Sequence, residues 1–321
     1  MSEEREYSEA RQRQIKRRRM EERRRRRRKK RIIRDTVLAA MLAVFILIVY
    51  GIGKLASFLI GNISSDSTSD KKPAQVKEEA TEAVVDTSLL TPEYLDCYNQ
   101  IADMSKDYPE VKTLYEGFSE YPVDLLELVI RNPETVEFVK EYPLKHNIKV
   151  IVDVSGDYEP GKIPLFIQWD ERWGYGSYGD NLMAINGCGP TCVSMVAVGL
   201  TGNTNYNPRH VADLSESNGY YSDTGTSWSL MTEGAAEFGI TGYTINITSD
   251  SIINELNQGH PIIASMQPGD FTTTGHFIVL TGIDEDGKII INDPNSKIRS
   301  EKRWETEVII SQSKSMWAYT V

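Results

Sequence analysis

The sequence predicts an α+β domain in its second half, in which a helix packs on an antiparallel sheet, preceded by a small helical module and a single N-terminal transmembrane helix. Three observations predict this layout. An apolar helix pattern begins at Cys188, strand patterns separated by turns occupy much of residues 241–321, and an uninterrupted apolar or weakly polar run covers residues 36–53. These eighteen residues approach the length that a membrane-spanning helix requires.

The charges on either side of the apolar run predict its orientation. Residues 1–35 hold 17 basic and 7 acidic side chains, whereas the rest of the chain holds 19 basic and 39 acidic ones. Because basic flanks stay on the cytoplasmic side, we predict a cytoplasmic tail at 1–35, an anchor at 36–60 that includes a snorkelling Lys54, and an extracytoplasmic remainder. The protein is therefore expected in the cell membrane as a single-pass protein.

The arginine cluster between residues 23 and 31 also resembles a footprint for nucleic acid. Its place beside the apolar run favours a different partner, because each basic residue near an anionic membrane surface contributes about 1 kcal/mol of attraction. We therefore expect the membrane, and no nucleic acid, as the partner of this tail.

Residues 61–90 are rich in Ser, Thr, Asp, Glu, Lys and Ala, which predicts a disordered stalk. Residues 91–147 predict three or four short helices punctuated by prolines, with Asn132 as an N-cap before Pro133. This helical module is compatible with a spacer, an inhibitory pro-segment or a substrate-positioning element. Spacer or structural support is the default interpretation.

Residues 148–321 predict the mixed domain. The alternation over 148–154 indicates a strand, and 227–238 indicates a helix closed by Gly239. The remaining strands are expected at 241–247, 262–266, 277–283, 288–292 and 316–321.

Cys188 follows a flexible turn and opens the apolar helix, in the run Gly187-Cys188-Gly189-Pro190-Thr191. Pro190 suits the first helical turn, where a missing N–H has no cost. The positive end of a helix and a neighbouring imidazolium both favour a thiolate, so the position suits a nucleophile. The alternative is a buried structural cysteine in a Gly-Pro turn.

His276 is the histidine best placed to act as a base. It opens a strand pattern beside Gly275, whereas the other three histidines lie in ordinary helix or turn contexts. Asp293 follows the next strand, just before Pro294, so two adjacent antiparallel strands would bring it near His276. It could orient the imidazole, and its alternative interpretation is an Asp-Pro turn.

A set of ordered motifs resembles a known family. They are Gln168-Trp169-Asp170-Glu171-Arg172-Trp173, Tyr178-Gly179, the run 187–191, Gly275-His276 and Asn292-Asp293-Pro294. Over residues 163–321 they resemble the stand-alone relatives of the peptidases that process double-glycine bacteriocin leaders, which are papain-like cysteine peptidases.

The resemblance implies a papain-like fold, and no cofactor is expected because Cys-His chemistry requires none. It implies Cys188 as nucleophile, His276 as general base and acid, Asp293 as orienting group and Gln168 as oxyanion donor. Gln168 lies twenty positions before Cys188, farther than in the leader-processing enzymes, so Asn186 is an alternative donor.

These features predict a membrane-anchored extracytoplasmic cysteine peptidase that acts on a peptide or protein. Leader removal is not favoured, because the sequence has no multi-span region and no phosphate-binding loop of a transporter. A peptidoglycan amidase or endopeptidase and a transglutaminase-like acyl transferase are alternatives. A surface binding module on an inactive scaffold is the non-enzymatic one.

Two smaller questions concern the other cysteines and the aromatic residues. Cys192 lies one turn after Cys188 without further metal ligands, so core packing is expected, and Cys97 is isolated, so no metal or disulfide framework is expected. The aromatic residues could line a groove or fill the core, namely Trp169, Trp173, Tyr175, Tyr178 and Trp228.

Overall fold

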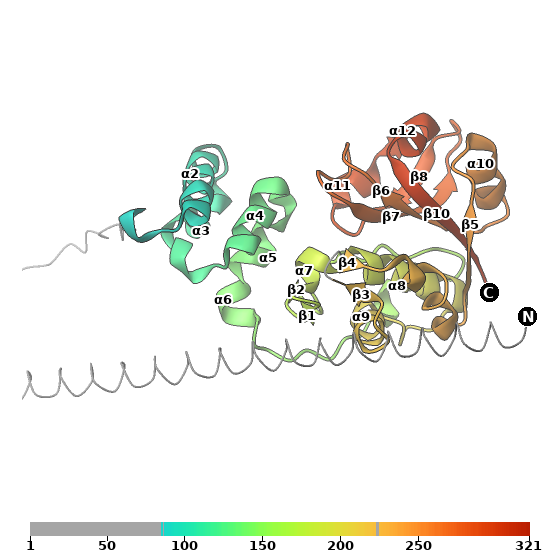
Figure 1. Cartoon of the computed structure of the whole chain (residues 1–321), viewed down its shortest axis with the longest axis horizontal. Coiled ribbons are helices and arrows are strands. Elements are labelled where there is room, and N and C mark those ends of the chain that lie inside the picture. The colour runs from blue at the N-terminus through green and yellow to red at the C-terminus, as the bar shows by residue number, and fades with distance from the viewer. Residues whose placement is uncertain (1–84, 86, 223–224) are drawn as a thin grey trace, which may run out of the picture. The chain divides into compact units, whose positions relative to one another are not determined.

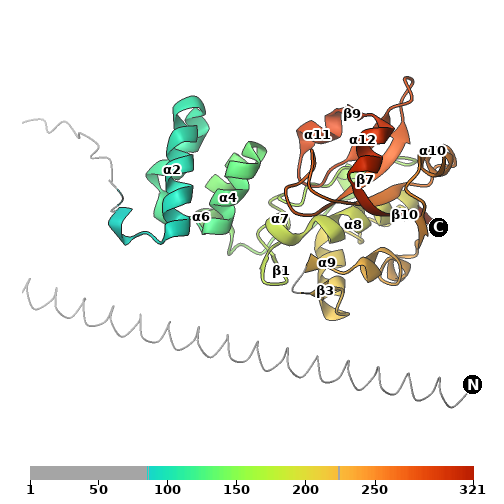
Figure 2. The same cartoon turned by 45° about the horizontal axis from the view of Figure 1, so that its top comes forward.

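The computed structural model describes Val85, residues 87–222 and residues 225–321, all within one compact unit that comprises Ala80–Val321. The predicted tail, anchor and nearly all of the stalk lie outside the described residues. Within the described part, every helix is too short or too polar to cross a membrane. Figures 1 and 2 show two parts of this unit from different angles: a group of helices at its beginning, and a sheet with the helices that cover it.

The predicted helical module is helical, although its helices are shorter and more numerous than expected. The α-helices are α2 (Pro92–Asp107), α3 (Lys112–Glu116), α4 (Val123–Arg131), α5 (Val136–Lys140) and α6 (Tyr142–Lys145). The 3-10 turns are η1 (Thr87–Leu89), η2 (Pro109–Val111), η3 (Phe118–Glu120) and η4 (Pro133–Thr135). The predicted N-cap is confirmed, since the Asn132 side chain accepts a hydrogen bond from the N–H of Glu134.

The core of these helices continues across the predicted boundary after residue 147. Ile101, Leu114 and Leu125 are fully buried in a cluster that also contains Trp169 and Ala184 from the second half of the chain. Burial of apolar surface is the main favourable contribution to folding. The helices and the following domain therefore share one hydrophobic core.

The strand predicted at 148–154 is wrong. Residues 148–154 form no strand and are followed by the 3-10 turn η5 (Ser155–Asp157). Ile151 is 93% exposed, and Ile148 and Val150 are also exposed, so only the end of the segment, at Val152 and Val154, packs on the core. Alternation produces a strand only where a neighbouring strand supplies the hydrogen bonds, and none pairs with this segment.

A six-stranded antiparallel sheet occupies the second half of the described chain, in the order β5-β10-β6-β7-β8-β9. Its strands are β5 (Thr241–Ile245), β6 (Ile262–Met266), β7 (His276–Ile283), β8 (Ile289–Asn292), β9 (Arg303–Trp304) and β10 (Ser313–Thr320). The five strands predicted after residue 240 are thus confirmed with small shifts at their ends. Two short ribbons pair β1 (Ser177–Tyr178) with β2 (Asn181–Leu182) and β3 (Tyr221–Ser222) with β4 (Gly225–Thr226).

Helices cover both faces of the sheet, which confirms the α+β class. One face packs on α8 (Cys188–Thr201), with α7 (Met183–Asn186) before it and α9 (Pro208–Ser217) after it. The other face is covered by α10 (Ser249–Asn257) and α12 (Thr306–Ser311), and α11 (Lys297–Glu301) follows β8. Figure 1 shows α8 and α10 on opposite sides of the strands.

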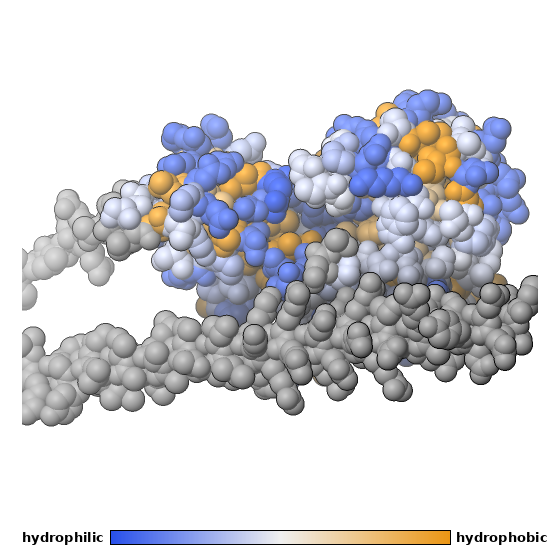
Figure 3. Space-filling view, viewed as in Figure 1, coloured by the Kyte–Doolittle hydropathy of each residue, from blue (hydrophilic) through white to orange (hydrophobic). Residues whose placement is uncertain are grey.

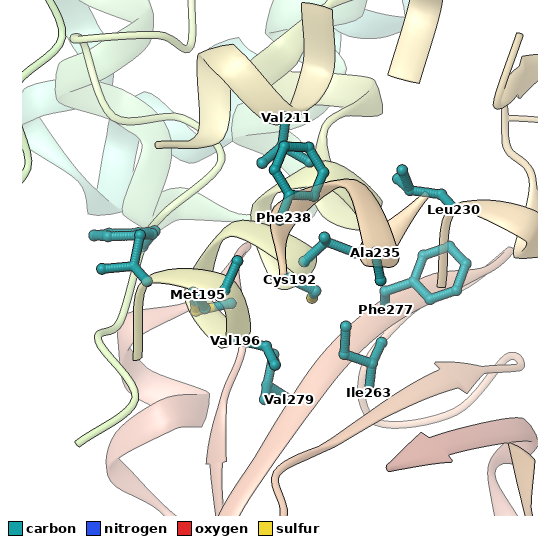
Figure 4. Packing of buried hydrophobic residues seen from close by; sticks show 14 of the residues in the cluster. Cys192, Met195, Val196, Val211, Leu230, Ala235, Phe238, Ile263, Phe277 and Val279 are labelled. Atoms are coloured by element: carbon teal, nitrogen blue, oxygen red, sulfur yellow. The ribbon is translucent and has the colours of Figure 1, made fainter. Parts of the chain in front are cut away.

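Residues of the central strands alternate between the two faces. Ile263 and Val279 join the cluster around α8, whereas Ile262 and Ile278 join the cluster beneath α10. Figure 4 shows Cys192, Met195 and Val196 of α8 among the sheet residues Ile263, Phe277 and Val279. Because both faces are covered, every residue of β6 is buried, and α8 is fixed on the sheet.

The helix predicted at 227–238 is instead two 3-10 turns, η6 (Trp228–Met231) and η7 (Ala235–Phe238). Thr232 interrupts them with φ −122° and ψ −78°, which are not helical angles. The predicted glycine terminus is confirmed, because Gly239 adopts φ +74°.

The visible surface of the described part is mainly hydrophilic to intermediate, with scattered hydrophobic residues (Figure 3).

Candidate active site

Cys188 is the first residue of α8 and one wall of a cavity of about 820 Å³. The helix behind it is buried from Gly189 to Val198, which fixes its first turn against the rest of the fold. Cys188 itself is half-buried, whereas Cys97 and Cys192 are buried and free of disulfides. Cys188 is therefore the cysteine that a molecule in the cavity can reach.

The two glycines beside Cys188 are required by close packing. A Cβ on Gly187 would lie 2.4 Å from the carbonyl oxygen of Met183, and a Cβ on Gly189 would lie 2.6 Å from the Thr226 methyl group. Thr226 is held in turn by Tyr178, whose hydroxyl lies 3.0 Å from the Thr226 hydroxyl. The absence of side chains at Gly187 and Gly189 thus allows the backbone on both sides of Cys188 to pack closely against Met183 and Thr226.

We expect Gly189→Ala to destabilise the protein by about 1–3 kcal/mol, because overpacking displaces neighbouring atoms. The displacement should also slow alkylation of Cys188. Thermal unfolding and the rate of iodoacetamide labelling measure both effects. Gly156→Ala is the matched control, since a Cβ there meets no atom within 4 Å; equal behaviour of the two variants would contradict the expectation.

His276 and Asp293 meet as the strand prediction requires. β7 and β8 pair Val279 with Asn292, and continuing this register puts Asp293 opposite Ile278. His276 is two residues from Ile278, so it shares a face with Asp293 as a diagonal neighbour. The His276 Nε2 atom lies 2.7 Å from Asp293 Oδ1, and both side chains are buried.

Asp293 is fully buried and is surrounded by donors. Its Oδ1 accepts from the N–H of Asn295 at 2.8 Å, and its Oδ2 accepts from the Nε–H of Arg299 at 2.6 Å. Its backbone N–H donates to the hydroxyl of Ser300 at 2.8 Å. Burial alone would raise the pKa of Asp293, but the charges and hydrogen bonds of His276 and Arg299 hold it below its ordinary value.

His276 is held as an imidazolium over a wide pH range. Burial lowers its pKa, but the charge of Asp293, the hydrogen bond to it and the interaction with Cys188 together raise the pKa to about 9. Since Nε2 is occupied by Asp293, Nδ1 is the ring nitrogen left for Cys188. An imidazolium beside Cys188 is the partner that a cysteine nucleophile requires.

Gln168 lines the same cavity, but much of its amide is already engaged. Its Nε2 lies 2.7 Å from the carbonyl oxygen of Ala184 and 3.4 Å from that of Ile185, and its Oε1 has no protein partner. The longer contact is weak, so the second N–H hydrogen remains the one that a ligand can attract. The backbone N–H of Gln168 donates to the carbonyl oxygen of Pro294 at 2.7 Å, which ties it to the Asp293 loop.

The alternative donor Asn186 is less available. Its Nδ2 lies 2.9 Å from the Tyr221 hydroxyl, 3.2 Å from the carbonyl oxygen of Tyr178 and 3.2 Å from Asp180 Oδ1. Three acceptors for two hydrogens leave no N–H for a ligand. Of the two predicted donors, the geometry favours Gln168.

The family comparison connects this geometry with known proteins. The model of the Peptidase_C39 like family matches residues 161–321, which is half of the chain. The chain belongs to this family. It is a cysteine peptidase of the papain-like kind, and Cys188, His276, Asp293 and Gln168 all lie within the match. The comparison with curated proteins gave no match.

Some side chains of this family member had no place in the sequence prediction. Arg299 donates a hydrogen bond to Asp293 and lines the cavity. In the sequence it is marked only as a basic residue six positions after Asp293, which does not predict this contact. Among the aromatic residues, Trp228 lines the cavity and is 49% exposed, whereas the other four are core residues, as is Cys192. Within the described residues no cluster of three His, Cys, Asp or Glu side chains could hold a metal ion.

For this peptidase we expect epoxide labelling of Cys188 to fall as pH rises through about 9. Opening an epoxide by a thiolate requires a proton, which the His276 imidazolium supplies below its pKa. An epoxysuccinyl probe with mass-spectrometric readout measures the rate, and iodoacetamide, which needs no proton, is the control reagent. An epoxide rate that keeps rising beyond pH 10 would contradict this role of His276.

Proposed function

We propose that this chain is a membrane-anchored cysteine peptidase that hydrolyses peptide bonds outside the cytoplasm through a Cys188 acyl-enzyme. The observation that carries the proposal is that Cys188 and His276 line one cavity, while the buried Asp293 binds His276 Nε2 and leaves the other ring nitrogen for the thiol. A nucleophile, a base and an orienting group are the three parts of this chemistry.

In the acylation step the Cys188 thiolate forms a bond to the carbonyl carbon of the substrate, and the carbonyl electrons move onto oxygen. Gln168 Nε2 and the backbone N–H of Cys188 would stabilise that oxyanion. When the intermediate collapses, the C–N bond breaks and the His276 imidazolium gives its proton to the leaving amine. A thioester and a neutral His276 remain.

In the second step neutral His276 takes a proton from water, whose oxygen attacks the thioester carbon. Collapse of the second intermediate breaks the C–S bond and releases the carboxylic acid product. The Cys188 thiolate and the His276 imidazolium are restored, so the cycle needs no cofactor.

The membrane part of the proposal rests on the sequence. The apolar run at 36–53 and the basic tail before it support a single anchor whose catalytic part lies outside the cytoplasm. The resemblance of the sequence motifs to stand-alone relatives of bacteriocin-leader peptidases supports a peptide or protein substrate.

The test of the activity is incubation of the detergent-solubilised full chain with a mixed peptide library and, separately, with peptidoglycan stem peptides. New amino termini that are absent with Cys188→Ala support a peptidase, and the cleaved pool identifies the substrate class. New amide cross-links instead of free termini would point to acyl transfer. A folded protein that yields neither product nor a hydroxylamine-trapped acyl group would contradict the proposal.

The location has its own test, which uses the difference among the cysteines. Cys97 and Cys192 are buried, so a membrane-impermeant thiol reagent should label Cys188 selectively in the native protein. Labelling in right-side-out vesicles, and not in sealed inside-out vesicles, is expected. The reverse pattern would contradict the proposed orientation.

A further inference from the structure

We infer that residues 128–134, where α4 leads into η4 of the helical module, are part of the active site, and that Glu134 is a positioning residue that holds Asp293 through α11. The inference rests on the proposed function, because it assigns a role in the same catalytic arrangement. It replaces the interpretation of these helices as a spacer.

Glu134 binds the segment that follows Asp293, across a sequence separation of more than 160 residues. One carboxylate oxygen accepts a hydrogen bond from the Ser296 hydroxyl. The other accepts from the backbone N–H groups of Lys297 at 2.8 Å and Ile298 at 3.1 Å. These are the first N–H groups of α11, which have no partner within their own helix.

The short helix α11 in turn holds Asp293. Ser296 caps it by accepting from the N–H of Arg299 at 3.0 Å, and the Arg299 Nε–H donates to Asp293 Oδ2 at 2.6 Å. Ser300 accepts the Asp293 N–H at 2.8 Å. A displacement of α11 would therefore move the carboxylate that orients His276.

Neighbours of Glu134 reach the same loop and the cavity. The Asn132 Nδ2–H donates to the carbonyl oxygen of Asn295, which also receives the indole N–H of Trp169 at 3.3 Å. Leu128, Arg131 and Asn132 line the cavity together with Cys188. One wall of the space open to substrate is thus built by the helical module.

The contacts also distinguish this role from that of an inhibitory pro-segment. Such a segment acts by covering the nucleophile, whereas Cys188 is half-buried and borders a cavity of about 820 Å³. The bonds of Glu134 and Asn132 go to residues 295–298, in the segment that follows Asp293, and not to Cys188. Helix α4 ends at Arg131. In Figures 1 and 2 it lies on the side of the sheet where α11 is found.

The test compares Glu134→Ala, Glu134→Gln and the control Glu137→Ala in the full chain. Glu137 lies one turn further on, is exposed, and pairs with Lys140 at 3.0 Å, away from residues 295–298. We expect Glu134→Ala to slow epoxide labelling of Cys188 by about 10- to 100-fold, the scale of a misplaced catalytic group. The alkaline fall in the rate should also move to lower pH, because His276 interacts less with Asp293.

Glu134→Gln should retain most of the rate, because its amide oxygen can accept from the two N–H groups and its amide nitrogen can donate to Ser296. Glu137→Ala should match the wild type in rate and pH profile. A role in stability alone would lower the folded fraction without moving the pH of the alkaline fall, so the profile separates the two roles.

A folded Glu134→Ala protein with the wild-type rate and profile would overturn the inference. If Glu134→Ala does not fold, Ser296→Ala removes one of the three bonds, and an unchanged profile in that variant would also overturn it. Failure of the proposed function looks different: the wild-type protein itself would show no His276-dependent reactivity at Cys188.

Discussion

Asp293→Ala is expected to lower the free energy of unfolding by about 3–5 kcal/mol at pH 7, the usual cost of breaking a buried ion pair by removing one partner. The change removes the carboxylate that binds both His276 and Arg299, and it leaves two cationic groups facing a buried space. Urea unfolding followed by circular dichroism measures the loss. Asp293→Asn keeps an acceptor oxygen and should cost less.

The effect of Asp293→Ala should depend on pH. The pKa of His276 is raised to about 9, so its stabilising interaction is complete below the unfolded value near 6.5 and is lost as pH rises through about 9. The pKa of Asp293 is lowered, so its contribution is present above about 4 and is lost at more acidic pH. A difference between wild type and variant that is as large at pH 10 as at pH 6 would contradict the assignment.

His276→Ala is expected to lower the rate of epoxide labelling at Cys188 by about 10²- to 10⁴-fold, the range of general acid catalysis. The variant loses the imidazolium that pairs with the thiolate and the proton that opens the epoxide. His260→Ala is the matched control, because His260 binds Glu255 at 2.8 Å and Tyr243 at 3.2 Å on another part of the sheet. Equal losses in the two variants would point to general damage to the fold.

Much of the geometry of the candidate active site could be predicted because local patterns determine it. The apolar strand patterns after His276 and before Asp293 predicted two strands, and antiparallel pairing places His276 Nε2 2.7 Å from Asp293 Oδ1. The Gly-Pro run predicted Cys188 at the start of a helix, and close packing of Gly187 and Gly189 explains the glycines.

The parts that escaped prediction depend on contacts between distant segments. Glu134 and Asn132 meet residues 295–298 only after folding, and a solvent-exposed glutamate and this one look alike in sequence. The segment 148–154 shows the opposite case, in which local alternation suggested a strand that no neighbour completes. Propensity is a weak guide where tertiary pairing decides the outcome.

The most direct test of the account is iodoacetamide labelling of the full chain across pH 4–10, with the labelled cysteine identified by mass spectrometry, for wild type, Cys188→Ala and His276→Ala. Wild-type Cys188 is expected to react at neutral pH, and this labelling should be absent in Cys188→Ala and much slower in His276→Ala. Labelling of Cys188 that is as fast in His276→Ala as in the wild type at every pH would contradict a catalytic thiol–imidazole pair and leave a binding role for this fold.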